Sequence, residues 1–91
     1  MTQARGTFEV LNKLGLHARA ATKLVQLASQ FSCDIVISRA GQSANAKSVM
    51  GVLLLCGSKG TTLDIEANGP SAEEAVQKLG QLISDRFGED E

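Results

Sequence analysis

The positions of apolar residues along the chain alternate between two periods, which predicts strands and helices in turn. Strict alternation of apolar and polar positions predicts half-buried strands over residues 6–11 and 61–67. A third strand, rich in β-branched residues, is predicted over residues 33–39. A turn over residues 40–43 then leads to a short partner strand over 44–46.

Three further stretches repeat apolar residues at helical spacing. The first predicted helix covers about 18–30, with Lys23 and Gln26 outward and the following residues inward: Leu24, Val25, Ala28 and Phe31. The second is short, from Val49 to Leu54 or Leu55, with Ser48 as its N-cap. The third begins after Ser71, which with Glu74 matches a capping box, and ends at Gly88.

The predicted order is strand, helix, strand, strand, helix, strand, helix. Strands with one apolar face and amphipathic helices indicate an α+β open-faced sandwich, with a four-stranded antiparallel sheet and three helices on one face. The 91 residues contain no repeat and no linker, so we expect one domain over residues 1–91. The acidic tail, residues 89–91, is predicted to be solvated and frayed.

Composition excludes several functions. The net charge is −1 and the only aromatic residues are three Phe, which argues against nucleic-acid binding. No apolar run approaches membrane-spanning length, and the first residues lack the apolar core of a signal peptide, so we expect no membrane insertion and a cytoplasmic location. Cys33 and Cys56 have no metal-binding or redox spacing and are predicted to be reduced, partly buried thiols.

The only histidine, His17, lies where a loop gives way to the first predicted helix. The first N–H groups of a helix lack partners within it and carry partial positive charge. An anion on His17 could therefore be bound by the backbone N–H groups of Ala18 and Arg19 and by the Arg19 guanidinium. The same partial charge favours a neutral imidazole, as a nucleophile requires. This indicates a phosphorylatable histidine; the alternative is an ordinary polar cap.

The sequence contains no motif that would let the chain catalyse phosphoryl transfer from ATP by itself. There is no Walker-type phosphate-binding loop and no carboxylate cluster for Mg²⁺, so neither a metal ion nor a cofactor is expected. The chain is predicted to be a relay between proteins and not an enzyme that uses ATP itself.

Two motifs resemble those of the HPr family, the histidine phosphocarriers of the bacterial phosphotransferase system. They are Gly15-Leu16-His17-Ala18-Arg19 and Lys47-Ser48-Val49-Met50-Gly51, and the likeness extends from Phe8 to the last helix near Phe87. The resemblance implies a monomeric phosphocarrier. Phosphate would arrive from enzyme I, charged by phosphoenolpyruvate, reside on His17, by family precedent on Nδ1, and leave to an enzyme IIA domain.

Ser48 and the residues beside it have both structural and functional interpretations. By resemblance, Ser48 is the regulatory serine that HPr kinase phosphorylates in many bacteria, and a phosphate at a helix N-terminus is electrostatically favourable. The following helix is apolar nearly all round, so some side chains must stay exposed as a docking patch. Met50 and Leu53 are the main candidates, with Val49 and Lys47 beside them, whereas Val52 and Leu55 are assigned to the core.

The sequence departs from the commonest family pattern at Ala20, where most members have proline. The residues Asn12-Lys13-Leu14-Gly15 resemble proteobacterial forms, some of which serve regulation more than sugar uptake. The alternative function is therefore a mainly regulatory phosphoprotein, of a nitrogen-related branch or under HPr kinase, with little direct role in sugar transport.

Overall fold

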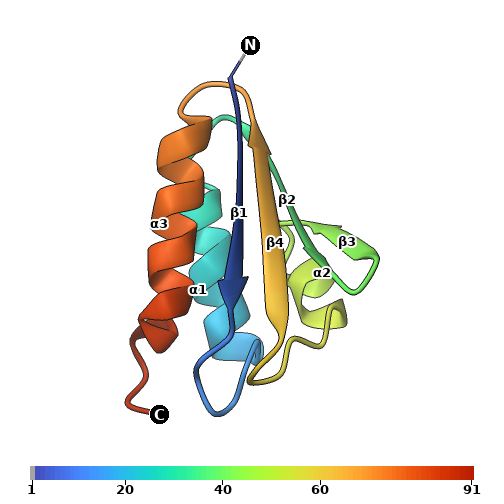
Figure 1. The fold of residues 1–91 in the computed structure, drawn as a ribbon, viewed down its shortest axis with the longest axis vertical. Helices are drawn as coiled ribbons and strands as arrows, with labels where there is room; N and C mark the ends of the chain where they lie inside the picture. The colour runs from blue at the N-terminus through green and yellow to red at the C-terminus, as the bar shows by residue number, and fades with distance from the viewer. Residues whose placement is uncertain (1) are drawn as a thin grey trace.

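The computed structural model describes residues 2–91; Met1, where the predicted domain begins, lies outside the described residues. The elements follow one another in the predicted order (Figure 1). They are β1 (Gln3–Glu9), α1 (Ala18–Ala28), β2 (Asp34–Arg39), β3 (Gln42–Asn45), α2 (Val49–Leu54), β4 (Thr62–Asn68), α3 (Ala72–Ser84) and the 3-10 turn η1 (Arg86–Gly88).

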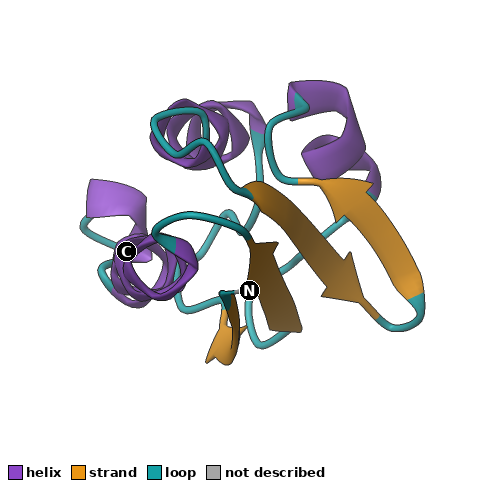
Figure 2. Cartoon of the chain, turned by 90° about the horizontal axis from the view of Figure 1, so that it is seen from above, coloured by secondary structure: helices purple, strands orange, loops and turns teal. Residues whose placement is uncertain are grey.

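The four strands form one antiparallel sheet in the order β1-β4-β2-β3. β4 pairs with β1, placing Leu63 opposite Phe8, and with β2, placing Ile65 opposite Ile37. Seen from above, the helices lie on one side of this sheet (Figure 2). The predicted α+β open-faced sandwich is therefore confirmed.

The core lies between the sheet and the helices and follows the predicted periodicity. Leu63, Ile65 and Ala67 of β4 are buried, whereas Thr62 and Asp64, which alternate with them, are exposed and Glu66 is half-buried. The helices contribute further fully buried side chains to the same core: Leu24, Ala28, Val52, Leu79 and Ile83. Each fully buried Leu or Ile contributes about 1.5–3 kcal/mol relative to an exposed one, so this layer supplies much of the fold's stability.

Two glycines allow α3 to approach β1 closely around the ring of Phe8. A Cβ atom built on Gly80 would lie 2.2 Å from Cε1 of that ring, and one on Gly6 would lie 2.7 Å from its Cζ. Glycine inside a helix costs about 1 kcal/mol relative to alanine, but here it provides the space that the Phe8 ring occupies.

Several predicted boundaries are wrong by a few residues. β1 begins at Gln3 instead of residue 6, and α1 ends at Ala28 instead of near residue 30. The turn before β3 is shorter than predicted, because Ala40 and Gly41 both have positive φ, 50° and 84°, and Arg39 already pairs with Gln42. Two consecutive residues with positive φ form the tight hairpin turn that matches strand twist.

The capping box predicted at the start of α3 is wrong. Ser71 occupies the N-cap position but has a left-handed backbone, with φ of 62°, and its side chain makes no cap hydrogen bond. In that conformation the hydroxyl does not reach the free N–H groups. The carboxylates of Glu73 and Glu74 in the first turn remain favourable next to the positive end of the helix dipole.

The end of α3 also differs from the prediction. The helix stops at Ser84, and Arg86 and Phe87 adopt left-handed conformations, with φ of 57° and 54°. This reversal buries the Phe87 side chain completely. It also directs the last residues to the end of the molecule that holds the β1–α1 loop (Figure 1).

Candidate functional site

His17 is the N-cap residue of α1, with an extended backbone that precedes the first helical turn. Its carbonyl accepts a hydrogen bond from the Ala21 N–H at 2.9 Å. Among residues 2–91, no acceptor is found for the N–H groups of Ala18, Arg19 or Ala20. The geometry thus leaves three free donors beside the histidine: those of Ala18 and Arg19, as expected from the sequence, and a third on Ala20.

The loop before His17 is held by two hydrogen bonds to the connection between α2 and β4 and by one hydrogen bond within itself. The Leu16 N–H donates to the Gly57 carbonyl at 2.7 Å, and the Gly60 N–H donates to the Val10 carbonyl at 2.8 Å. The buried Asn12 side chain donates from Nδ2 to the Gly15 carbonyl at 2.8 Å. These contacts give the histidine a rigid base, although the loop itself has no regular secondary structure.

The imidazole of His17 contacts a residue from the opposite end of the chain, Glu89. His17 Nε2–H donates to Glu89 Oε2, while Asn12 Nδ2 donates to Glu89 Oε1 at 3.0 Å. The side chains of His17 and Glu89 are 25% and 15% exposed. The prediction that the acidic tail is solvated is therefore wrong for Glu89, because the reversal after α3 carries it onto the histidine.

Two more contacts hold the tail in place. Lys23 Nζ donates to the Phe87 carbonyl at 2.6 Å, so this α1 side chain does not point freely outward as predicted. The Lys13 N–H donates to the Glu91 carbonyl. The Lys13 and Glu91 side chains are 3.9 Å apart but mostly exposed, so their ion pair adds little.

The environment of Glu89 favours its charged form. The hydrogen bond from His17 is the largest cause that holds the pKa of Glu89 below its ordinary value. Burial acts in the opposite direction, whereas the Asn12 hydrogen bond and the positive charge of Lys23 lower the pKa further. Glu89 is accordingly a carboxylate at neutral pH and accepts hydrogen bonds without donating any.

Arg19 lies exposed beside this cluster. It lines a hollow of about 500 Å³ together with residues of the β1–α1 loop and the tail: Lys13, Leu14, Glu89, Asp90 and Glu91. Within residues 2–91 its guanidinium makes no hydrogen bond or ion pair. The positively charged guanidinium of Arg19 is therefore available to bind an anion next to the free N–H groups of α1.

The family of the chain follows from its similarity to known proteins. The family model described as "PTS HPr component phosphorylation site" matches residues 4–85. The chain belongs to the HPr family. It is 49% identical over 82 residues to the phosphocarrier protein HPr of Cupriavidus necator, covering 90% of this chain and 92% of that protein.

The similarity extends to a second kind of phosphocarrier and to solved structures. The phosphocarrier protein NPr of Shewanella violacea is 40% identical over 89 residues, 98% of each chain. The crystal structure of HPr-C-His from Thermoanaerobacter tengcongensis superposes with a TM-score of 0.91, at 42% identity and full coverage of both chains. As an HPr family member, the chain is a phosphocarrier of the phosphotransferase system, whose partners are other proteins of that system.

The second HPr motif begins α2. Ser48 is its N-cap, as predicted, and its Oγ accepts a hydrogen bond from the Gly51 N–H at 3.1 Å. The Lys47 side chain is engaged elsewhere, because its Nζ donates to the Phe31 carbonyl at 2.7 Å.

The apolar residues of α2 divide between core and surface. Val52 and Leu55 are buried, as predicted, while Val49 and Leu53 are partly buried against the core. Met50 is 69% exposed, and so is Leu54, at 71%, which was not among the predicted docking residues. Helical spacing could have found it, because Leu54 lies four residues after Met50 on the same face.

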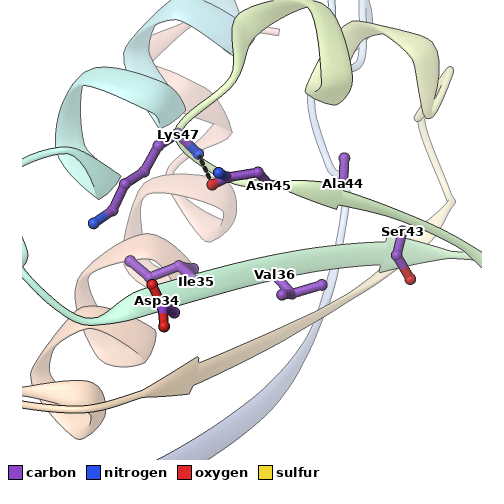
Figure 3. A pocket seen from close by; sticks show the side chains of 7 residues that line it. All are labelled: Asp34, Ile35, Val36, Ser43, Ala44, Asn45 and Lys47. Carbon is purple, nitrogen blue, oxygen red and sulfur yellow. Dashed lines mark hydrogen bonds between the residues drawn. The ribbon is translucent and has the colours of Figure 1, made fainter.

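A second hollow, of about 430 Å³, lies between β2 and β3 (Figure 3). Its lining residues are Asp34, Ile35, Val36, Ser43, Ala44, Asn45 and Lys47. The Asn45 side chain turns back to accept a hydrogen bond from the Lys47 N–H at 2.9 Å, as the dashed line in Figure 3 marks. This hollow shares no residue with that of Arg19 and is not part of the histidine site.

Both cysteines are free thiols, but they differ in exposure. Cys33 is buried, whereas Cys56 is exposed and has a left-handed backbone, so the prediction of partial burial is wrong for Cys56. No group of three or more potential metal ligands occurs within residues 2–91. Over the same residues, every helix is too short or too polar to cross a bilayer.

Proposed function

We propose that this HPr family member relays a phosphoryl group from phosphoenolpyruvate-charged enzyme I to enzyme IIA domains through a phosphohistidine at His17. The observation that carries the proposal is the set of free donors at the start of α1, beside the only histidine. Free N–H groups at a helix N-terminus stabilise a dianionic phosphate by hydrogen bonds and by the partial positive charge of the helix end. The chain is a carrier with a covalent intermediate and not an independent catalyst.

Arg19 acts with the backbone of Ala18 and Arg19 to neutralise the phosphate. Its exposed guanidinium, without a partner among residues 2–91, supports this role. One exposed arginine binds an anion strongly enough to receive it and weakly enough to release it, because charge-assisted hydrogen bonds at exposed sites are modest.

The experiment is incubation of the chain with enzyme I and labelled phosphoenolpyruvate. Acid-labile label should appear on the wild type and be lost in His17→Ala; label that persists in His17→Ala would exclude His17 as the acceptor. Arg19→Ala should slow labelling, whereas Lys13→Ala, which removes another exposed cation from the same hollow, should not.

Docking to these partners uses the exposed face of α2. Met50 and Leu54 form the exposed apolar pair, with Leu53, Val49 and Lys47 beside them. Apolar side chains this exposed stabilise a complex when a partner covers them. Leu54→Ser should raise the KM for enzyme I without loss of fold. Leu82→Ser, at a partly buried leucine of α3 that packs against the core, should lower stability but leave that KM unchanged, and so controls for destabilisation.

A second candidate function is regulation at Ser48 by HPr kinase/phosphorylase. Its support is the position of Ser48 at the N-terminus of α2, next to the exposed Met50. A phosphate there would add about 1.5 to 2 negative charges to the docking face. An ATP-dependent, acid-stable phosphate on Ser48 would support this function, and Ser48→Asp should then accept phosphate from enzyme I more slowly than wild type.

The physiological output has two candidates, sugar transport and a mainly regulatory, nitrogen-related role. Similarity to phosphocarriers of both names, HPr and NPr, motivates the second. The test is the rate of transfer from the phosphorylated chain to purified IIA domains of each branch, the faster acceptor identifying the output. In either case, we propose that the chain acts in the cytoplasm as a monomeric single domain.

A further inference from the structure

Both oxygen atoms of the Glu89 carboxylate are engaged, each by a different side chain of the β1–α1 loop. His17 Nε2–H donates to Oε2, and Asn12 Nδ2 donates to Oε1 at 3.0 Å. Asn12 is fully buried and also donates to the Gly15 carbonyl at 2.8 Å. The carboxylate is therefore fixed in orientation, and through it the imidazole plane is fixed as well.

This contact determines which ring nitrogen carries the hydrogen. A carboxylate can only accept hydrogen bonds, so the nitrogen that faces it must be the protonated one. In the neutral imidazole, Nε2 then bears the hydrogen and the lone pair lies on Nδ1. The same logic applies to an aspartate that holds a catalytic histidine in its productive tautomer.

We propose that Glu89, oriented by Asn12, is a positioning residue for phosphoryl transfer, keeping Nδ1 of His17 as the free nucleophile and stabilising the charge that the ring acquires. The inference rests on the proposed function, in which His17 is the acceptor. It assigns a role to the acidic tail, and neither family motif contains that segment.

The transfer step is balanced without a change in protonation at Glu89. The Nδ1 lone pair attacks phosphorus and forms the N–P bond, while the bond from phosphorus to the donor breaks and its electron pair leaves with the donor. The ring becomes cationic, retains its Nε2 hydrogen, and stays hydrogen-bonded to the carboxylate. Passing the phosphoryl group to the next acceptor reverses these changes. A fixed negative charge stabilises the cationic ring without reorganisation during the reaction.

The tail contains a matched control for the charge of Glu89. Glu91 lies two residues further on, but its side chain is mostly exposed and pairs only with Lys13, at 3.9 Å. Glu91→Gln therefore removes the same charge from the same segment without touching the histidine. Glu89→Gln keeps the size of the side chain, but its amide can either accept from Nε2–H or donate to Nε2.

The experiment combines nitrogen NMR of the ring with labelling kinetics on the full chain. Because His17 is the only histidine, its ring nitrogens are identified directly in ¹⁵N-labelled protein. We expect the neutral wild-type ring to carry its hydrogen on Nε2, and Glu89→Gln to spread it over both nitrogens. Labelling by enzyme I should slow about tenfold in Glu89→Gln, the effect of losing one hydrogen bond to a charged group, and stay at the wild-type rate in Glu91→Gln.

Two results would overturn the inference: a wild-type ring that carries its hydrogen on Nδ1, or a Glu89→Gln variant that is labelled at the wild-type rate. The first needs no variant, so a folding defect in Glu89→Gln leaves the test intact. Failure of the proposed function is distinguishable, because it would appear as label on His17→Ala. Loss of label in His17→Ala with a wild-type rate in Glu89→Gln would remove only the role of Glu89.

Discussion

Gly15 lies against the backbone of Gly57 so closely that a Cβ atom on Gly15 would be 2.4 Å from the Gly57 carbonyl oxygen. That oxygen already accepts a hydrogen bond from the Leu16 N–H at 2.7 Å. Gly15 also has φ of 64°, a conformation that side chains with a Cβ disfavour. Position 15, two residues before His17, must therefore be glycine for two independent reasons.

Gly15→Ala should lower the free energy of unfolding by about 1–3 kcal/mol, measured by urea denaturation. It should also slow labelling of His17, because the loop that holds the ring must shift. Gly41→Ala is the matched control: its φ is also positive, 84°, but a Cβ atom on Gly41 would have no neighbour within 4 Å. Equal decreases in the free energy of unfolding of the two variants would show that the close contact with Gly57 does not contribute to the cost of Gly15→Ala.

Lys23→Met should loosen the tail while leaving α1 intact. The substitution removes the hydrogen bond from Nζ to the Phe87 carbonyl, at a cost of roughly 1 kcal/mol. We expect faster amide hydrogen exchange at Gly88 and Glu89, measured by NMR. Lys78→Met, which removes an exposed i,i+4 pair with Glu74, should leave these rates unchanged; faster exchange in both variants would contradict the specific role of Lys23.

The stability of the chain should depend on pH through Glu89. Its pKa in the folded chain is lower than the ordinary value of 4.5, so its interactions stabilise the fold above that pH and are lost as the pH falls below it. The difference in unfolding free energy between wild type and Glu89→Gln should therefore shrink as the pH falls from about 5 to about 3 in urea titrations. A difference that stays constant across this range would contradict the lowered pKa of Glu89. Glu91→Gln is the control, because it removes a carboxylate that does not contact His17.

Ser48→Ala should lower the free energy of unfolding by about 1 kcal/mol, because the Gly51 N–H loses its cap. Ser48→Asp keeps an acceptor and adds a favourable charge at the helix start, so its stability should match the wild type. Thermal unfolding measures both. Ser71→Ala is the control, since that N-cap side chain makes no cap hydrogen bond, and a similar loss there would contradict the explanation.

The sheet and the helices were predictable because their signals are local and repeated. Alternation at residues 62–67 places Leu63 and Ile65 inward whatever the rest of the chain does, and Ser48 caps α2 through an atom three residues away. The capping box at Ser71 failed because its backbone is left-handed, which a motif of residue types does not encode.

By itself, the sequence determined the order of elements, the inward faces, and the histidine at a helix start beside Arg19, since each depends on neighbours in the chain. Tertiary structure alone decided that Glu89 would meet His17, across 72 residues of separation. That contact depends on the left-handed turn at Arg86 and Phe87, on the bond from Lys23 and on buried Asn12. Tertiary packing decides which groups surround a carboxylate. The sequence of an acidic tail therefore does not tell whether its carboxylates are solvated or bound to another part of the chain.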